Sequence, residues 1–323
     1  MTSTRTFIVG GAGFIGSHFT DRLLDGGAAG VTLYDNFSSG REWHYAHHRH
    51  DSRLRVVRGD AKDLPALQQA MRGHDTVIHL ASNPDIARAA TEPDIDFREG
   101  TFLTQQVVEA MRVTGTPNLL YASGSGVYGD LGAFEIAEDH GPLLPVSTYG
   151  ASKLAGEAMI SSYCAMFHLQ ASVFRFGNVV GPRQTHGVGF DFVRRLLADP
   201  TQLRILGNGA QSKSYIHVDD VVTAVLLAHG KRTKSFEVFN VATGDYIRVS
   251  EIAKLALEVV GLDPDNVHFA YTGGDRGWQG DVPVVRLNTD RIQRLGWSCQ
   301  RNSRCALHAS MQSLAQDSRN GKL

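Results

Sequence analysis

A tyrosine and a lysine stand four residues apart in the segment 147–153, where Tyr149 precedes Lys153. On a helix this spacing places both side chains on one face. A phenol has a pKa of about 10 and is a poor base near neutrality, but a fixed cation nearby favours the phenolate. A pKa lowered by roughly three units would require about 4 kcal/mol of differential stabilisation. The pair is therefore a candidate general base with the cation that tunes it.

The N-terminal region predicts a binding site for a dinucleotide. An apolar strand is followed by a glycine-rich turn over residues 10–16 and then by a helical apolar pattern. Either Gly10 or Gly11 permits the tight turn. Gly13 lets backbone amides approach a pyrophosphate at the helix N-terminus, and Gly16 lets helix and strand pack closely.

A second apolar strand ends at Asp35, nineteen residues after Gly16. A carboxylate at this position would accept hydrogen bonds from the adenosine ribose. The same charge would repel a 2′-phosphate, so NAD is favoured over NADP. An oxidised nicotinamide ring beside Tyr149 would add to the positive charge that favours its phenolate.

Seven short segments of the chain carry the resemblance to one protein family, because they follow in the family's order and at compatible spacing. They lie at 10–17, 35–37, 59–60, 77–81, 127–129, 149–153 and 175–183. Together they resemble the extended short-chain dehydrogenase/reductase family, specifically its nucleotide-sugar epimerases and dehydratases. The likeness covers nearly the whole chain.

The expected fold is α/β, a doubly wound parallel (Rossmann) sheet with a smaller α/β C-terminal substrate lobe. Apolar strand candidates at 54–57, 76–80, 117–122 and 171–176 alternate with helical patterns, which indicates a parallel sheet covered on both faces. The resemblance implies an interleaved chain. Its expected boundaries are an NAD-binding domain at 1–176, to which 215–242 returns, and a lobe formed by 177–214 and 243–323.

The resemblance implies an NAD-dependent isomerase with Tyr149 as the base and Lys153 bound to the nicotinamide ribose. A sugar hydroxyl would be oxidised to a transient keto-sugar, and bound NADH would return its hydride to the opposite face. The residues expected to bind the cofactor are Gly10, Gly13, Phe14, Ile15, Gly16, Asp35, Asn36, Ser38, Gly40, Asp60, Ala61, Leu80, Ala81 and Ser82, with Tyr149 and Lys153.

The turn after the strand at 117–122 departs from the family pattern. The family usually has Ser or Thr four positions before the tyrosine that corresponds to Tyr128, where this chain has Gly124. Ser125 and Ser123 are the candidates to supply the missing hydroxyl. Family dehydratases carry Asp-Glu at the next two positions, which here are Ser125 and Gly126, so elimination lacks its proton carriers.

Three residues are expected to bind the substrate in addition to Ser125. The resemblance points to Asn178, to Lys213 where relatives usually have Arg, and to Arg276 as a late phosphate-binding arginine. Lysine supplies charge without the bidentate fork of arginine. The spacing from Arg276 to the next Gly-Asp is two residues longer than in the family.

These patterns predict epimerisation at C4 of a UDP-hexose or UDP-hexuronic acid. An epimerase acting at another carbon or on another nucleotide sugar, a dehydratase, and a catalytically silent NAD-binding sensor or scaffold are the alternatives. The identity of the sugar, the nucleotide and the pathway, and the choice between the two serines, stay open at this point.

The overall charge balance of the sequence limits the kinds of binding partner to be expected. The 32 Lys and Arg nearly balance the 33 Asp and Glu, so neither a nucleic acid nor a membrane is expected as a partner. No signal peptide pattern precedes the first strand, and a cytoplasmic location is the expectation. The resemblance implies a homodimer paired through helices near 100–112 and 151–168.

A histidine-rich segment at 43–50 contains His44, His47, His48 and His50. No cysteine accompanies it at metal-ligand spacing, and no carboxylate arrangement supports it. The segment is interpreted as a solvated helix beside the adenine, and no metal is expected.

Overall fold

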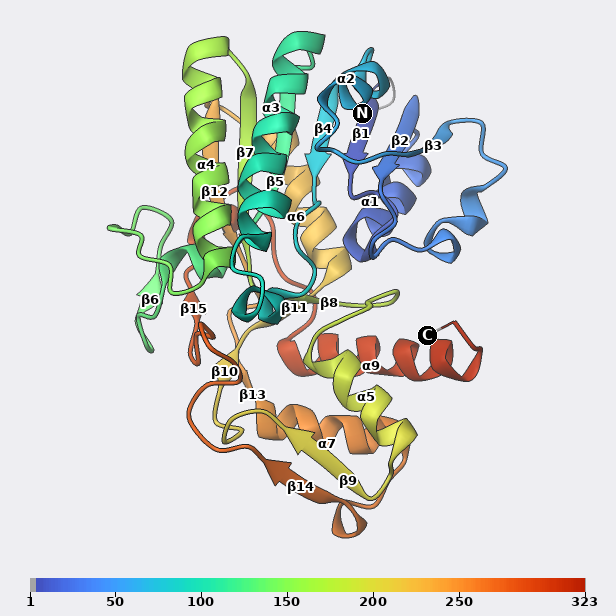
Figure 1. Cartoon of the computed structure of the whole chain (residues 1–323), viewed down its shortest axis with the longest axis vertical. Helices are drawn as coiled ribbons and strands as arrows, with labels where there is room; N and C mark the ends of the chain where they lie inside the picture. Colours follow the sequence, from blue (N-terminus) through green and yellow to red (C-terminus); the bar gives the residue numbers. More distant parts are fainter. Residues whose placement is uncertain (1–3, 323) are drawn as a thin grey trace. The chain divides into compact units, whose positions relative to one another are not determined.

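The computed structural model describes residues 4–322, and the chain divides into two compact units (Figure 1). The first unit contains the residues up to Val127, Thr148–Arg175 and Val222–Phe239, and the second contains Tyr128–Ser147, Phe176–Val221 and the residues from Asn240. Residues 128–147, expected in the first domain, lie in the second unit. The reason is that β6 (Glu135–Ile136) pairs in parallel with β15 (Arg286–Leu287).

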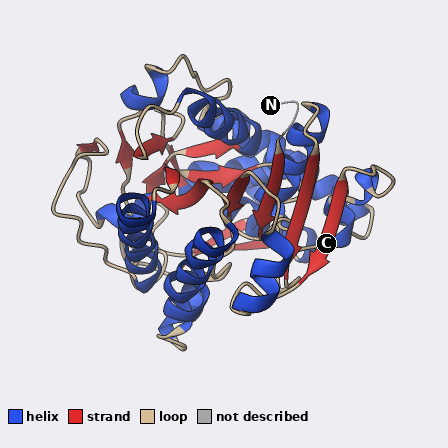
Figure 2. Cartoon of the chain, turned by 90° about the horizontal axis from the view of Figure 1, so that it is seen from above, coloured by secondary structure: helices blue, strands red, loops and turns tan. Residues whose placement is uncertain are grey.

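The first unit is built on a seven-stranded sheet with the order β12-β7-β5-β4-β1-β2-β3, drawn among the red strands of Figure 2. Its strands are β1 (Arg5–Val9), β2 (Gly30–Asp35), β3 (Leu54–Arg58), β4 (Thr76–His79), β5 (Asn118–Gly124), β7 (Gln170–Phe176) and β12 (Phe236–Val241). β1 pairs in parallel with both β2 and β4, and the strand order reverses there. The predicted doubly wound parallel sheet is confirmed.

Alternating side chains of the strands fill both faces of this sheet. On one face, Phe7, Val77 and Leu119 belong to an apolar cluster that includes Val107 and Ile160. The helices on this face are α2 (Leu64–Met71), α3 (Leu103–Thr114) and α4 (Thr148–Phe167). α4 carries the predicted Tyr149 and Lys153, so this packing fixes the helix that positions them.

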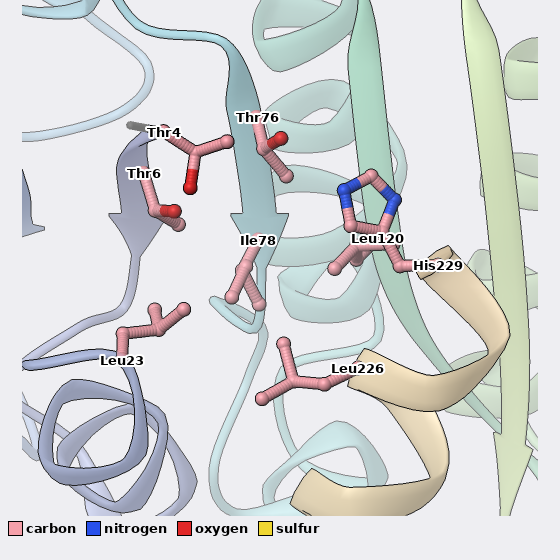
Figure 3. A pocket seen from close by; sticks show the side chains of 8 residues that line it. All are labelled: Thr4, Thr6, Leu23, Thr76, Ile78, Leu120, Leu226 and His229. Carbon is pink, nitrogen blue, oxygen red and sulfur yellow. The ribbon is translucent and has the colours of Figure 1, made fainter. Parts of the chain in front are cut away.

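The other face is covered by α1 (Phe14–Asp25) and α6 (Val218–Lys231). Leu23 and Leu226 of these helices approach Ile78 and Leu120 around a small cavity, which Figure 3 shows in close-up. Thr6 and Thr76 place this cavity near the amino ends of β1 and β4. Ligands of doubly wound sheets bind at the carboxyl ends of the strands, so the candidate site must be sought at the opposite edge.

The second unit has its own core between helices and a small sheet. α5 (Val188–Ala198), α7 (Val249–Val260) and α9 (Ser303–Arg319) contact one another, and β9 (Gln202–Ile205) pairs in parallel with β14 (His268–Tyr271). Buried residues of α5, α7, α9 and β9 belong to one apolar cluster, and partly buried Phe269 of β14 packs against it. The remaining elements are β8 (Asn178–Val180), β10 (Ser212–Lys213), β11 (Tyr215–His217), β13 (Ile247–Arg248) and α8 (Asp290–Gln293).

Short helical turns connect the longer elements. They are η1 (Glu42–His44), η2 (Ala46–His48), η3 (Ile86–Ala90), the π-helical turn η4 (Phe97–Phe102), η5 (Ser125–Tyr128) and η6 (Pro264–Asn266). Between residues 4 and 322, no helix is both long enough and apolar enough to traverse a bilayer.

Candidate active site

The turn between β1 and α1 is shaped for a pyrophosphate. Gly10 has a φ of +80°, and a Cβ there would lie 2.9 Å from the Ala81 amide nitrogen. Gly10, rather than Gly11, therefore makes the tight turn. A Cβ on Gly16 would lie 2.6 Å from the Gly10 carbonyl oxygen, so only glycine permits this packing. Gly13 is the N-cap of α1 and offers no side chain, and the first turn has no acidic residue, so its amides are open to an anion.

Asp35 ends β2 with its carboxylate buried and oriented by the backbone. Its Oδ2 accepts a hydrogen bond from the Ala12 amide at 2.9 Å, and its Oδ1 accepts one from the Phe37 amide at 2.8 Å. Burial raises the pKa of Asp35, while these two hydrogen bonds and the charge of Arg58 oppose that shift. A Cβ on Gly40 would lie 2.9 Å from Oδ1. Each oxygen keeps a second lone pair for a ribose hydroxyl.

The other residues predicted to bind the cofactor lie after β2, β3 and β4. The Leu80 and Ala81 amides both donate to the Val9 carbonyl, at 2.9 and 3.1 Å, which holds this segment against β1. Asp60 accepts a hydrogen bond from the Lys62 amide at 2.9 Å. Phe14 and Ala61 are buried, Ile15 is half-buried, and the Ser38 amide donates to Asn36 Oδ1 at 3.0 Å.

The histidine-rich segment is not a solvated helix, and that interpretation was wrong for His44. The segment forms the short turns η1 and η2, and His44 is fully buried. Its Nδ1 lies 2.8 Å from the Ala12 carbonyl oxygen, and the Arg41 amide donates to the same carbonyl at 3.1 Å. His44 is therefore an internal support of the glycine turn.

Tyr149 and Lys153 lie within the first two turns of α4, as their spacing predicted. The Lys153 Nζ is 5.6 Å from the centre of the Tyr149 ring and 5.2 Å from that of Tyr121. Lys153 is only 3% exposed, and its Nζ donates a hydrogen bond to the Ala122 carbonyl at 2.8 Å. The ammonium is thus fixed between the end of β5 and the face of the tyrosine.

The surroundings of this pair set its protonation. Burial lowers the pKa of Lys153 to about 8, against the opposing effects of Asp96 and Glu157. Burial raises the pKa of Tyr149, a hydrogen bond with Ser82 lowers it, and the charge of Asp96 raises it. The protein's own groups therefore favour the neutral phenol. Burial is the largest cause of the Tyr149 pKa shift. The expected lowering of that pKa by Lys153 together with an oxidised nicotinamide ring stays a prediction.

Two residues near Tyr149 were not predicted for these roles. Ser82, expected only as a cofactor contact, is hydrogen-bonded to Tyr149. Asp96 is 1% exposed and accepts hydrogen bonds from Asn83 at 2.9 Å and from the Thr148 hydroxyl at 2.7 Å. Thr148 is the first residue of α4, so Asp96 anchors the helix end that carries Tyr149. No local signal marks Asp96, which is 52 residues from Thr148 along the chain.

The two candidate serines at the end of β5 have different surroundings. Ser123 is buried, and its hydroxyl donates to Glu157 Oε1 at 2.5 Å. Ser125 begins η5 and is half-buried, and within residues 4–322 no partner bonds its hydroxyl. A Cβ added to Gly124 would meet no heavy atom within 4 Å. The place of the family's usual hydroxyl is therefore open space.

In the second unit, the two cationic side chains predicted to bind a diphosphate both form hydrogen bonds with Asp281. The Lys213 Nζ is 2.5 Å from Asp281 Oδ1, and the Arg276 guanidinium donates to the Asp281 carbonyl oxygen at 2.5 Å. Arg276 also forms an ion pair with Asp130 at 2.6 Å. Lys213 lies 68 residues from Asp281 and Arg276 lies 146 residues from Asp130, so these ion pairs were not predicted.

Asn178, the third predicted substrate contact, lies at the start of β8 and is exposed. Its side-chain amide and its backbone amide both donate to the Ser214 carbonyl, each at 3.1 Å. The side-chain oxygen then points away from that bond as an acceptor. β8 pairs with β11 from this residue onward, with Tyr215 opposite Asn178.

A doubly wound sheet, a glycine turn with a buried carboxylate after β2, and a helical tyrosine and lysine define a class of nucleotide-dependent enzyme. Residues 6–242 match the model of the NAD dependent epimerase/dehydratase family, and the chain belongs to this family. The predicted family, fold class, enzyme class and NAD cofactor are thereby confirmed.

Relatives of known activity cover almost the whole chain. The chain is 34% identical over 304 residues to UDP-glucose 4-epimerase of Mycolicibacterium smegmatis, covering 92% of this chain and 94% of that protein. It is similar to a crystal structure of UDP-galactose 4-epimerase, with 35% identity, a TM-score of 0.85 and coverage of 97% and 99%.

A dehydratase is also among the similar structures. It is a double mutant of DesIV, a dTDP-glucose 4,6-dehydratase from Streptomyces venezuelae, solved with NAD bound. It shares 26% identity and a TM-score of 0.89, with 98% of each chain covered. The choice between epimerisation and elimination therefore depends on the residues of the site.

Proposed function

We propose that this protein is an NAD-dependent nucleotide-sugar epimerase that inverts C4 of a UDP-hexose or UDP-hexuronic acid. The observation that carries the proposal is the pair formed by half-buried Tyr149 and buried Lys153 at the start of α4. The similarity to the UDP-glucose and UDP-galactose 4-epimerases supports both the reaction and the uridine nucleotide.

The residues of the first unit suit NAD. We assign the pyrophosphate to the amides after Gly13, the adenosine ribose to Asp35 and the nicotinamide ribose to Lys153. The start of α1 supports this assignment, because its N-cap Gly13 has no side chain that caps the first amides. When bound, NAD would take a hydride from the sugar carbon and later return it.

Tyr149 would take the proton of the reacting hydroxyl. Burial keeps its phenol neutral, so a hydrogen-bond donor that stabilises the phenolate is needed. Ser82 is in contact with Tyr149 and lowers its pKa, and we assign it this positioning role. Lys153 adds a positive charge whose place is fixed by the Ala122 carbonyl.

Ser125 would orient the reacting hydroxyl in place of the family's usual Ser or Thr. Its hydroxyl is free of protein partners among the residues described, whereas that of Ser123 is engaged by Glu157. Gly124 leaves open space beside it, so a substrate group could approach the turn closely.

The rival reaction is elimination, favoured by the similarity to a dTDP-glucose 4,6-dehydratase. Elimination of water from a hexose requires an acid and a base near C5 and C6. The positions where family dehydratases carry these carboxylates hold Ser125 and Gly126. We therefore place the protein with the epimerases.

In the second unit, we assign the substrate diphosphate to Lys213 and Arg276, with Asn178 as a further hydrogen-bonding group. The convergence of both cations on Asp281 supports this assignment, because it holds two positive groups together. A diphosphate would compete with the Asp130 and Asp281 carboxylates for them.

NMR of the products from a panel of nucleotide sugars tests the proposed function. The panel contains UDP-glucose, UDP-glucuronate, UDP-N-acetylglucosamine and dTDP-glucose, each incubated with the NAD-loaded protein. A C4 epimer of at least one UDP-sugar is expected. A 4-keto-6-deoxy product would show a dehydratase, and NAD binding without turnover of any sugar would favour the sensor.

We further infer a homodimer in the cytoplasm. Phe102 and Val113 near the ends of α3, and Met166 and Phe167 at the end of α4, are between 39% and 67% exposed, which supports pairing of these helices between two copies. The cysteines are all free thiols, in keeping with a reducing compartment. Light scattering at micromolar concentration tests the dimer, and a monomer would contradict it.

A further inference from the structure

Two histidines and an aspartate of the first unit lie close together in space. His47 Nε2 lies 2.8 Å from Asp21 Oδ1, and His48 Nε2 lies 2.9 Å from the same oxygen. The three potential ligand atoms all lie within 4.8 Å of one another. Such a grouping of imidazole nitrogens and a carboxylate is a donor set that first-row transition metals accept.

The carboxylate comes from a part of the sequence that spacing does not reveal. Asp21 lies on α1, whereas His47 and His48 lie on η2, and 26 residues separate Asp21 from His47. The histidine-rich segment alone contains no companion carboxylate for these two rings. The fold supplies it from α1.

We propose that Asp21, His47 and His48 bind a divalent transition-metal ion, with Zn²⁺ as the representative ion. Two imidazoles and one carboxylate suit Zn²⁺ and disfavour Mg²⁺ and Ca²⁺, which take oxygen ligands. Three protein ligands leave a fourth tetrahedral position for water.

The two histidine–aspartate separations require only a small adjustment. Bonds of about 2.0–2.1 Å place neighbouring ligand atoms of a tetrahedral zinc site about 3.3 Å apart. The present separations of 2.8 and 2.9 Å would widen by about half an ångström. The side chains are 52% exposed for His47, 24% for Asp21 and 15% for His48, so an ion can enter the site from solvent. The imidazole ring of His47, the most exposed of the three, can rotate to bind it.

The proposed metal site lies beside a segment that contacts the glycine turn. α1 begins at the glycine turn, and the segment before η2 contacts that turn through His44 and Arg41, both bonded to the Ala12 carbonyl. A metal that joins η2 to α1 would hold this segment against the turn. On the proposed cofactor assignment, Zn²⁺ would then tighten NAD binding.

Calorimetric titration of ZnCl₂ into the untagged, EDTA-treated and dialysed full chain tests the site. Saturable binding of about one Zn²⁺ per chain is expected, because the three proposed ligands form a single site. The variant His47→Ala/His48→Ala should lose this binding. His50→Ala is the matched control, since His50 lies in the same segment and bonds Arg49 instead.

Asp21→Asn keeps a hydrogen-bond acceptor for both rings but removes the anionic ligand, and it should weaken Zn²⁺ binding at least tenfold. Circular dichroism confirms that each variant is folded. Absence of saturable binding in the parent, or full binding by the folded double variant, would overturn the metal site. The titration contains no nucleotide sugar, so a failure of the proposed epimerase activity leaves its result intact. Unchanged NAD affinity with Zn²⁺ bound would overturn the coupling.

Discussion

The Ser123 hydroxyl donates a hydrogen bond to Glu157 across 2.5 Å, and both side chains are buried. Glu157 also accepts two hydrogen bonds from Arg175, at 3.0 and 2.7 Å. A buried carboxylate is stable only when its partners satisfy it, so these three groups act as a unit that joins β5, α4 and β7. The Ser123 hydroxyl is thus bonded within the protein interior, which supports our proposal that Ser125 binds the substrate.

Ser125→Ala should lower kcat by about ten- to a thousandfold, as expected for a lost hydrogen bond in the transition state. Ser123→Ala should lower Tm and affect kcat less, because it removes a partner of buried Glu157. Steady-state kinetics and thermal unfolding of both variants measure this. Adding Gly124→Ser to Ser125→Ala should restore part of the rate, since the space at Gly124 is open. A damaging Ser123→Ala beside a silent Ser125→Ala would reverse the assignment.

The pH dependence of kcat should shift in opposite directions when the two neighbours of Tyr149 are changed. The phenolate is the active form, so the rate rises with pH through the pKa of Tyr149. Asp96 raises that pKa, and Asp96→Asn should move the rising limb to lower pH. Ser82 lowers it, and Ser82→Ala should move the limb to higher pH.

Thr148→Val is the control for these pH profiles. It removes one hydrogen bond to Asp96 and keeps the carboxylate charge, so the limb should move less than in Asp96→Asn. Profiles that shift in the same direction for Ser82→Ala and Asp96→Asn would show that Tyr149 does not define the limb.

Asp35→Asn should weaken NAD binding by about ten- to a hundredfold, because the ribose loses hydrogen bonds to a charged acceptor. NADP binding should weaken less or improve, since the negative charge facing the 2′-phosphate is gone. The Asn side chain keeps an acceptor for one of the two backbone amides. Calorimetry with both nucleotides measures the ratio, and a parent protein with equal affinity for NADP would disprove the role of Asp35.

Lys213→Ala should raise the KM for the UDP-sugar by about tenfold with little change in kcat, if the ammonium binds the diphosphate equally in ground and transition states. Lys213→Arg should restore most of the affinity. Lys254→Ala is the matched control on an exposed position of α7. A loss confined to kcat would instead place Lys213 at the reacting carbon.

Local sequence patterns predicted most of the fold, and within the site they predicted the glycine turn and the pair of Tyr149 and Lys153. The strand, glycine turn and helix at residues 5–25, and the helical spacing of Tyr149 and Lys153, depend on neighbours within a few positions, so the sequence was sufficient to predict them. The sequence could not choose between Gly10 and Gly11, because the choice depends on a backbone angle.

The remainder of the site depends on contacts between distant segments. Asp96 meets Thr148 across 52 residues, and Lys213 meets Asp281 across 68. The direction of the Tyr149 pKa shift depends on burial, which spacing does not report. The place of 128–147 depends on the pairing of β6 with β15, two strands too short to give a periodic signal.

The most direct test follows the hydrogen at C4 during turnover. The NAD-loaded protein is incubated in D₂O with the UDP-sugar of the panel that it converts, and the sugar is examined by NMR and mass spectrometry, with Tyr149→Phe as the folded control. The proposed mechanism predicts the C4 epimer without deuterium at C4, because the hydrogen that leaves the carbon returns to it, and almost no product from Tyr149→Phe. Deuterium at C4 of the product, or a Tyr149→Phe variant within a few-fold of the parent rate, would contradict it.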